Sequence, residues 1–331
     1  MKIFITGGTG FIGSYIVEML LDDGHTVHLL ARCPEKVIAH HENLIVFKGD
    51  ITDSNSIEDA MVGCEKVYHV AAYAKPWAKD PQDFYRVNLD ATKNIFDAAK
   101  KHKVDKIVFT STAGTLGPSS AAEIPVKEED KRRGIVLTDY ENSKIKAEEL
   151  CRKYVDEEHM NIVIVNPPRV YGPGVVNESN GVTRLVKMYL SGKWRIIPGD
   201  GSGVGSYVHV ADVAKGYLLA MENGRAGERY ILGGENLTYN EFFHILAEVS
   251  DKKQQLVKLP YPLMLAAAQL FVINQKITGR PPLITPPWVK KYKTHWTLSS
   301  EKATRELGYT FRPLHEGLQE TVNWLKEKYS L

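Results

Sequence analysis

The chain has 331 residues, of which 43% are hydrophobic and 25% are charged, and its formal net charge at pH 7 is +2. These proportions are typical of a globular protein, and the length allows one large domain or two that pack closely. Positive and negative residues are interspersed along the chain, so we expect no nucleic-acid partner.

The cysteines and histidines indicate neither a disulfide framework nor a metal site. Cys33, Cys64 and Cys151 are few and scattered, and no cysteine or histidine pair has the spacing of metal ligands. We therefore predict a reducing compartment, a cytoplasmic location and no metal. The longest apolar run, 263–273, is shorter than the roughly 20 residues of a membrane span. It predicts no integral membrane segment and leaves open a peripheral contact with a membrane.

Apolar runs rich in β-branched residues alternate with helical patterns through the first half of the chain. This alternation is typical of a parallel sheet built from right-handed strand–helix–strand units. After Pro168 the elements are shorter and prolines separate them. The expected strands are 2–6, 25–30, 43–50, 66–72, 105–112, 161–168, 206–210 and 229–232, and the expected helices are 13–23, 83–103, 139–159, 181–191, 210–222, 238–249, 261–277 and 314–328.

Four glycines lie within residues 7–13, directly after the first expected strand and at the start of a helix. In this position the free backbone N–H groups of a helix N-terminus and the helix dipole bind a phosphate. The spacing Gly7-x-x-Gly10-x-x-Gly13 differs from the commoner G-x-G-x-x-G. Gly7 would make the turn, Gly10 would let the backbone approach the phosphate, and Gly13 would let helix and strand pack closely. The loop predicts a dinucleotide site.

Several motifs together resemble the extended (atypical) short-chain dehydrogenase/reductase superfamily, in its NAD-dependent epimerase/dehydratase family and its dihydroflavonol-reductase-like branch. The resemblance covers nearly the whole chain. It implies an α/β fold: a Rossmann-type doubly wound parallel sheet binding NADP over 1–168, and a smaller α/β substrate-binding lobe over 169–331 with some chain returning to the first domain. The motifs are TGGTGFIG (6–13), GDITD (49–53), HVAA (69–72), FTSTAGT (109–115), Tyr140-x-x-x-Lys144, NPPRVYGPG (166–174), YVHVADVA (207–214) and ITGRPPLIT (277–285).

The end of the second strand favours NADP(H) over NAD(H). In an NAD site an acidic residue there binds the adenosine ribose, whereas an arginine accommodates the 2′-phosphate of NADP. Here the acidic position is Ala31, Arg32 follows it, and Lys36 could add charge. The resemblance implies these further cofactor contacts: Thr9, Phe11 and Ile12 in the loop, Asp50 and Ile51 at the adenine, Ala71, Ala72 and Tyr73 after the fourth strand, and Pro167 and Val170 near the nicotinamide.

Tyr140 and Lys144 lie four residues apart, so they share one face of a helix. A nearby ammonium favours the phenolate, so we expect Lys144 to lower the pKa of Tyr140 and let it exchange a proton with a carbonyl oxygen. Lys144 could also hydrogen-bond the nicotinamide ribose. These two residues are the expected centre of a hydride-transfer site.

Three further residues are implied by the resemblance as catalytic. The family's catalytic hydroxyl falls on Thr112, where serine is more usual, and the adjacent Ser111 is an alternative. Asn88 resembles a structural or proton-relay asparagine. We expect His209 to lie at the junction of the lobes and Asp212 to cap the helix that follows it.

Three functions stay open. The first is an NADP(H)-dependent reductase of a hydrophobic or aromatic carbonyl compound. A lid at 260–287 has apolar residues that would suit such a substrate, and the alternative is that they pack in the core.

The second function is that of a sugar-nucleotide epimerase or dehydratase, which would need a cation for the diphosphate. Gly205 occupies the position where related enzymes carry an arginine, and no cation lies in the loop before it. The third, a non-catalytic NADP-sensing regulator, fits poorly with the Tyr–Lys pair. A homodimer is expected only from its frequency in the superfamily.

Overall fold

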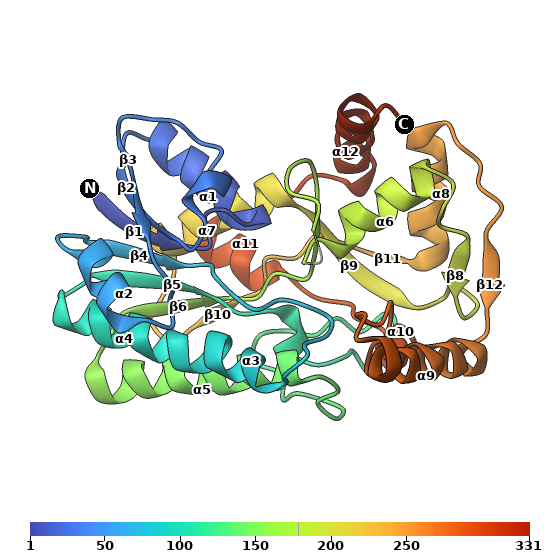
Figure 1. The fold of residues 1–331 in the computed structure, drawn as a ribbon, viewed down its shortest axis with the longest axis horizontal. Coiled ribbons are helices and arrows are strands. Elements are labelled where there is room, and N and C mark those ends of the chain that lie inside the picture. Colours follow the sequence, from blue (N-terminus) through green and yellow to red (C-terminus); the bar gives the residue numbers. More distant parts are fainter. Residues whose placement is uncertain (178) are drawn as a thin grey trace.

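The computed structural model describes residues 1–177 and 179–331, and its largest element is a seven-stranded sheet. All of its paired strands run parallel, in the order β10-β6-β5-β4-β1-β2-β3 (Figure 1). The Rossmann-type doubly wound fold is thereby confirmed. Its strands are β1 (Lys2–Thr6), β2 (Thr26–Ala31), β3 (Leu44–Lys48), β4 (Lys66–His69), β5 (Lys106–Thr110), β6 (Ile162–Val165) and β10 (Arg229–Tyr230).

Helices cover both faces of this sheet, which explains why its central strands are apolar throughout. Along β1, Ile3 and Ile5 pack into one core layer, while Phe4 between them packs into the other, as the two-residue period of a strand requires. The first layer is covered by α1 (Phe11–Asp22), α7 (Val210–Asn223) and α11 (Glu301–Leu307), and the second by α2 (Ser54–Met61), α4 (Ala91–Lys101) and α5 (Asp139–Glu158).

The helix expected over 83–103 is interrupted. It consists of α3 (Gln82–Tyr85), a π-helical turn (Arg86–Asp90) and α4. The turn contains Asn88, and π-turns of this kind often lie at functional sites. Helix α2 was not expected from the sequence, although Asp53 caps it by accepting a hydrogen bond from the backbone N–H of Asn55.

The second half of the chain forms a smaller lobe beside the sheet (Figure 1). A three-stranded sheet, β11-β9-β7, and a two-stranded sheet, β12-β8, make its strands. Strand β10 and helix α7 come from this half of the sequence but belong to the large sheet and its cover, and the boundary at 168 stays a prediction. The lobe contains β7 (Arg169–Tyr171), β8 (Ile196–Pro198), β9 (Val204–His209), β11 (Glu235–Thr238) and β12 (Val257–Leu259), with α6 (Gly181–Leu190), α8 (Tyr239–Ser250), α9 (Tyr261–Thr278), α10 (Pro286–Tyr292) and α12 (Leu314–Tyr329).

Candidate active site

The glycine loop joins β1 to α1 with very little space around its backbone. Gly7 has a φ of +78°, and a Cβ there would lie 2.6 Å from the backbone nitrogen of Ala71. A Cβ on Gly13 would lie 2.2 Å from the carbonyl oxygen of Gly7. Gly10 is the N-cap of α1 and has no side chain to cap it, so N–H groups of the first helical turn are free for a ligand. This tight cradle fits the pyrophosphate of a dinucleotide.

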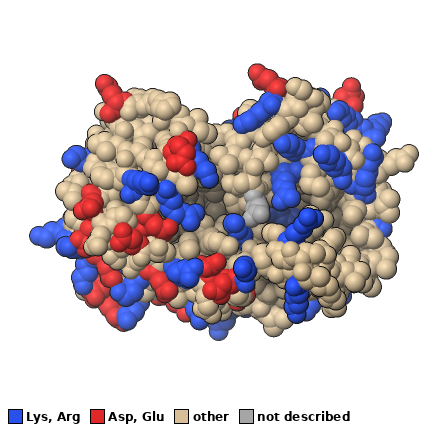
Figure 2. Space-filling view, in the orientation of Figure 1, with Lys and Arg blue, Asp and Glu red and all other residues tan. Residues whose placement is uncertain are grey.

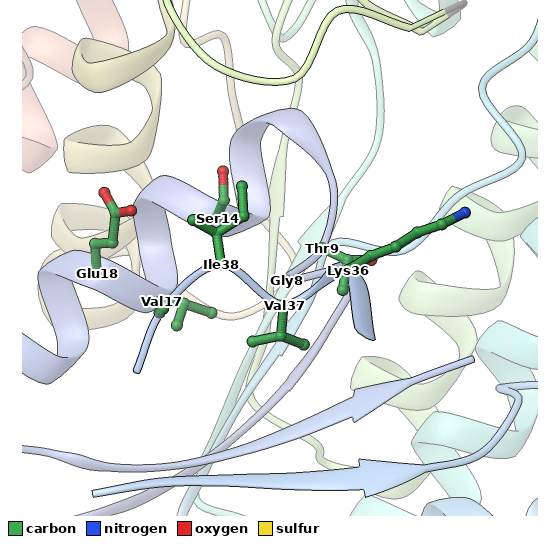
Figure 3. Close-up of a pocket in the computed structure, with 9 residues that line it drawn as sticks. Gly8, Thr9, Ser14, Val17, Glu18, Lys36, Val37 and Ile38 are labelled. Atoms are coloured by element: carbon green, nitrogen blue, oxygen red, sulfur yellow. The ribbon is translucent and has the colours of Figure 1, made fainter. Parts of the chain in front are cut away.

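Two cations stand near the loop. Lys36, at the end of a 3-10 turn (Pro34–Lys36), lines a small pocket with Gly8 and Thr9, and its side chain extends past Thr9 (Figure 3). The side chain of Arg32 is 75% exposed and its Nε lies 3.9 Å from the carboxylate of Asp50. Such an exposed ion pair is weak, so Arg32 stays available to a phosphate.

Tyr140, Lys144 and Thr112 meet where β5 ends and α5 begins. The Thr112 hydroxyl lies beside the Tyr140 phenol and favours its ionised form. Lys144, one turn further along α5, is almost completely buried, and its Nζ lies 4.3 Å from the centre of the Phe109 ring. This Nζ has no hydrogen-bond partner in the described part of the chain. A buried ammonium without a partner is costly, so the site fits a ligand with hydroxyl groups, such as the ribose of a nicotinamide nucleotide.

Burial dominates the pKa values of this pair. It raises the pKa of Tyr140 to about 12, with Thr112 opposing the shift and Glu141 adding to it. It lowers the pKa of Lys144 to about 8. The expectation that Lys144 sets a lowered pKa for Tyr140 is therefore wrong for the protein alone, because burial penalises the phenolate and only the Thr112 hydroxyl opposes the rise of its pKa. Tyr140 is held as a protonated phenol.

Ser111 and Thr112, adjacent in sequence, have different partners. The Ser111 hydroxyl donates to the buried carboxylate of Glu148. Thr115 Oγ1 and Asn166 Nδ2 donate to the same oxygen at 2.7 Å and 2.8 Å. Of the two candidate hydroxyls, therefore, the one that the structure brings to Tyr140 is Thr112.

Glu148 was not identified from the sequence, although it lies four residues after Lys144 on the same helical face. Its second oxygen faces Arg229 at 3.6 Å and Arg152 at 3.7 Å. We expect Glu148→Ala to lower the free energy of unfolding by about 3 kcal/mol, because it leaves buried donors and Arg229 without their acceptor. Urea unfolding measures the change. The exposed neighbour Glu149 gives the control, since Glu149→Ala should change stability little.

Asn88 holds the loop that follows β4. Its side-chain oxygen accepts the backbone N–H of Tyr73 at 2.7 Å, and its Nδ2 donates to the Ser143 hydroxyl at 3.0 Å. Its hydrogen bonds therefore connect the loop at 71–73 to α5, on the helix that carries Tyr140. This arrangement favours the structural role of Asn88 over a relay through its own side chain.

The N-terminus of α7 is capped by His209 and not, as expected, by Asp212. His209 caps α7, its side chain accepting the N–H of Ala211, and burial lowers its pKa to about 4, so it is neutral at pH 7. The expected cap at Asp212 is wrong: its carboxylate pairs with Arg312 at 3.0 Å instead. An aspartate in the first turn is also well placed for a cation from another element, and here that contact prevails.

Comparison with known proteins identifies the family. The model of the NAD dependent epimerase/dehydratase family matches residues 3–233.

The chain belongs to this family.

Among its relatives, cinnamoyl-CoA reductase 2 of Medicago truncatula is 30% identical, with 98% of this chain and 91% of the relative covered. Dihydroflavonol 4-reductase of Dianthus caryophyllus is 28% identical over 74% of this chain and 72% of its own. The solved structure of UDP-glucose 4-epimerase from Thermotoga maritima with UDP-glucose has a TM-score of 0.82, 26% identity and 99% coverage of both chains. The relatives thus include both reductases and an epimerase, and the chain is an NAD(P)-dependent enzyme of the extended short-chain type.

Within this family architecture, the structure overturns one expectation about Gly205. A cation does lie there: a Cβ on Gly205 would be 2.0 Å from Nη1 of Arg169. Strand β7 pairs in parallel with β9 and brings Arg169 beside Tyr207. The guanidinium donates to the hydroxyls of Tyr207 and Tyr239 at 2.9 Å and 3.0 Å, and no carboxylate of the described residues pairs with it. Absence of a cation therefore no longer argues against an anionic substrate group.

Residues 1–177 and 179–331 contain no group of three or more His, Cys, Asp or Glu side chains placed to hold a metal ion. They also contain no helix long and apolar enough to cross a membrane.

Proposed function

We propose that the chain is an NADP(H)-dependent reductase that transfers hydride to the carbonyl of a hydrophobic or aromatic small molecule. The observation that carries this proposal is the group formed by Tyr140, the Thr112 hydroxyl beside it and the buried Lys144, whose Nζ has no hydrogen-bond partner among the described residues. The relatives named cinnamoyl-CoA reductase and dihydroflavonol 4-reductase support it.

Each of the three side chains has a distinct part in this reaction. The nicotinamide cofactor, when bound, supplies the hydride. Tyr140 holds a proton on its phenol oxygen and gives it to the carbonyl oxygen as negative charge develops there. The Thr112 hydroxyl donates a hydrogen bond to the same oxygen. The Lys144 ammonium binds the ribose hydroxyls and stabilises the phenolate that Tyr140 becomes.

Lys144 gives the reaction a predicted dependence on pH. Its pKa is lowered to about 8, so the ammonium is present below that pH and is lost above it. We expect kcat/KM for NADPH to fall as the pH rises through about 8, because this ratio reports the ionisation of the enzyme before NADPH binds. A pH profile of NADPH consumption measures it. A profile flat from neutral pH to well above 8 would contradict the assignment.

Arg32 and Lys36 support the choice of NADP(H), and Arg32 gives its test. We expect Arg32→Ala to weaken NADPH binding about tenfold or more and to leave NADH binding nearly unchanged, because only NADPH carries the 2′-phosphate that the guanidinium would bind. Titration of both nucleotides side by side measures the preference. Lys93→Ala removes a cation from the exposed side of α4 and should change neither affinity. Tighter binding of NADH than of NADPH by the unchanged protein would reject the choice.

Arg169 favours a second candidate, a sugar-nucleotide epimerase or dehydratase, because a guanidinium whose partners among residues 1–177 and 179–331 are neutral hydroxyls suits a diphosphate. The two reactions differ in the fate of the cofactor. A reductase exchanges it at each turnover, whereas an epimerase returns it to its starting state and can retain it. Native mass spectrometry of the freshly purified protein distinguishes them: a dinucleotide that survives dialysis favours the epimerase, and an exchangeable one favours the reductase.

A further inference from the structure

Helix α9 has an exposed apolar face that points away from the protein. Leu263, Leu270 and Ile277 follow one another at intervals of seven residues, and Ile273 lies close to the same line, so the four share one side of the helix. Their exposed fractions run from 53% to 80%. Met264 and Ala268, the buried residues of α9, lie on the opposite side. The apolar stripe of Leu263, Leu270, Ile273 and Ile277 is therefore not part of the core.

The segment around α9 carries charge of one sign. Residues 252–300 contain eight lysines and arginines and no aspartate or glutamate, although charges are interspersed over the chain as a whole. Lys276 and Arg280 are exposed at the end of α9, and Lys290 and Lys293 are exposed beyond it. In Figure 2 no acidic side chain lies over α9, and basic ones border its apolar surface. An apolar stripe bordered by cations is complementary to the surface of an anionic bilayer.

Helix α10 connects this face to the catalytic residues. Trp288 Nε1 donates to the carbonyl oxygen of Pro76 at 3.0 Å, on the other lobe. Lys291 Nζ donates to Glu141, the neighbour of Tyr140, at 2.8 Å. Since α9 and α10 pack together through Met264 and Val289, a surface bound by α9 would lie beside the helix that contacts Glu141, the neighbour of Tyr140.

We propose that the stripe on α9 and the basic residues around it dock the protein on the surface of an anionic lipid bilayer. The helix lies in the interface and does not cross it. The docking does not depend on the proposed reductase activity. If that activity is correct, docking presents the active site to substrates that partition into the membrane.

Co-sedimentation with vesicles tests the proposal on the full-length protein. We expect binding to phosphatidylcholine vesicles that contain phosphatidylglycerol, weaker binding to phosphatidylcholine alone, and release by added salt. Leu270→Asp/Ile277→Asp should reduce the bound fraction at least about tenfold, and Lys276→Gln/Arg280→Gln should reduce it less. Thermal unfolding and NADPH binding unchanged from wild type would show that these variants fold.

A matched control separates the stripe from a general effect of added charge. Val62 is 56% exposed at the end of α2, on the other lobe, and Val62→Asp adds the same carboxylate as Ile277→Asp. Only Ile277→Asp should lower vesicle binding. Failure of the wild type to bind anionic vesicles, or equal binding by the stripe variant, would overturn the proposal. So would self-association in ultracentrifugation that the stripe variant abolishes while no vesicle binding is seen, because a second copy would then cover the stripe.

Discussion

Tyr140→Phe is expected to reduce kcat for carbonyl reduction by about 10²–10⁴-fold, the usual contribution of a positioned proton donor. The change removes only the phenol oxygen. The aromatic ring at position 140, at the start of α5, therefore keeps its place near Phe84 of α3. NADPH binding should stay nearly the same, because the glycine loop and Lys144 remain. NADPH consumption at saturating substrate measures kcat, and fluorescence titration measures binding.

The control for this variant lies on the same helix. Tyr154→Phe removes an equivalent hydroxyl. Tyr154 lies 14 residues after Tyr140 on α5, and its hydroxyl contacts Asp97 on α4. Tyr154→Phe should therefore retain kcat and at most lower stability. Retained turnover in Tyr140→Phe would exclude Tyr140 as the proton donor. Loss of NADPH binding in the same variant would assign it to the cofactor site instead.

The features predicted correctly from the sequence depend on local pattern. Alternating strands and helices in the first half indicated the parallel sheet, which the structure and the family confirm. The glycine loop was recognisable because its glycines are spaced along one strand–helix connection. The tight contact between Gly13 and Gly7 lies within seven residues of sequence, whereas the contact of Gly7 with Ala71 could not be read from the loop. Tyr140 and Lys144 are likewise neighbours on one helical face.

The features that the sequence did not reveal depend on contacts between distant segments. Arg169 reaches Gly205 only because β7 and β9 pair in a particular register. Glu148 gains its role from Ser111 and Asn166, which come from two other connections. The π-turn at Arg86–Asp90 contains one residue more than an α-helical turn, and the spacing of apolar residues does not predict such an insertion. For the same reason, the partner of Asp212 could not be foreseen from its place after His209.

Gly13→Ala is expected to weaken NADPH binding by about a hundredfold or more. The new methyl group would overlap the carbonyl oxygen of Gly7, which accepts the N–H of Gly10 at 2.9 Å. Relief of this overlap requires α1 to move away from β1, and the N–H groups that would hold the pyrophosphate then lose their positions. We also expect stability to fall by about 1–3 kcal/mol, as for other overpacked sites. Calorimetric titration with NADPH and thermal unfolding measure the two effects.

Two further glycines make this prediction decisive even if Gly13→Ala folds poorly. A Cβ on Gly10 would lie 3.0 Å from the Gly7 oxygen, a tight contact that a small shift relieves, so Gly10→Ala should fold and bind NADPH less tightly than wild type. Gly181, at the start of α6, has open space around its Cβ position, and Gly181→Ala should leave binding and stability unchanged. If both Gly13→Ala and Gly10→Ala bound NADPH as the wild type does, the loop would not hold the pyrophosphate. A graded loss, with Gly13→Ala more affected than Gly10→Ala, is what a phosphate held against the backbone requires.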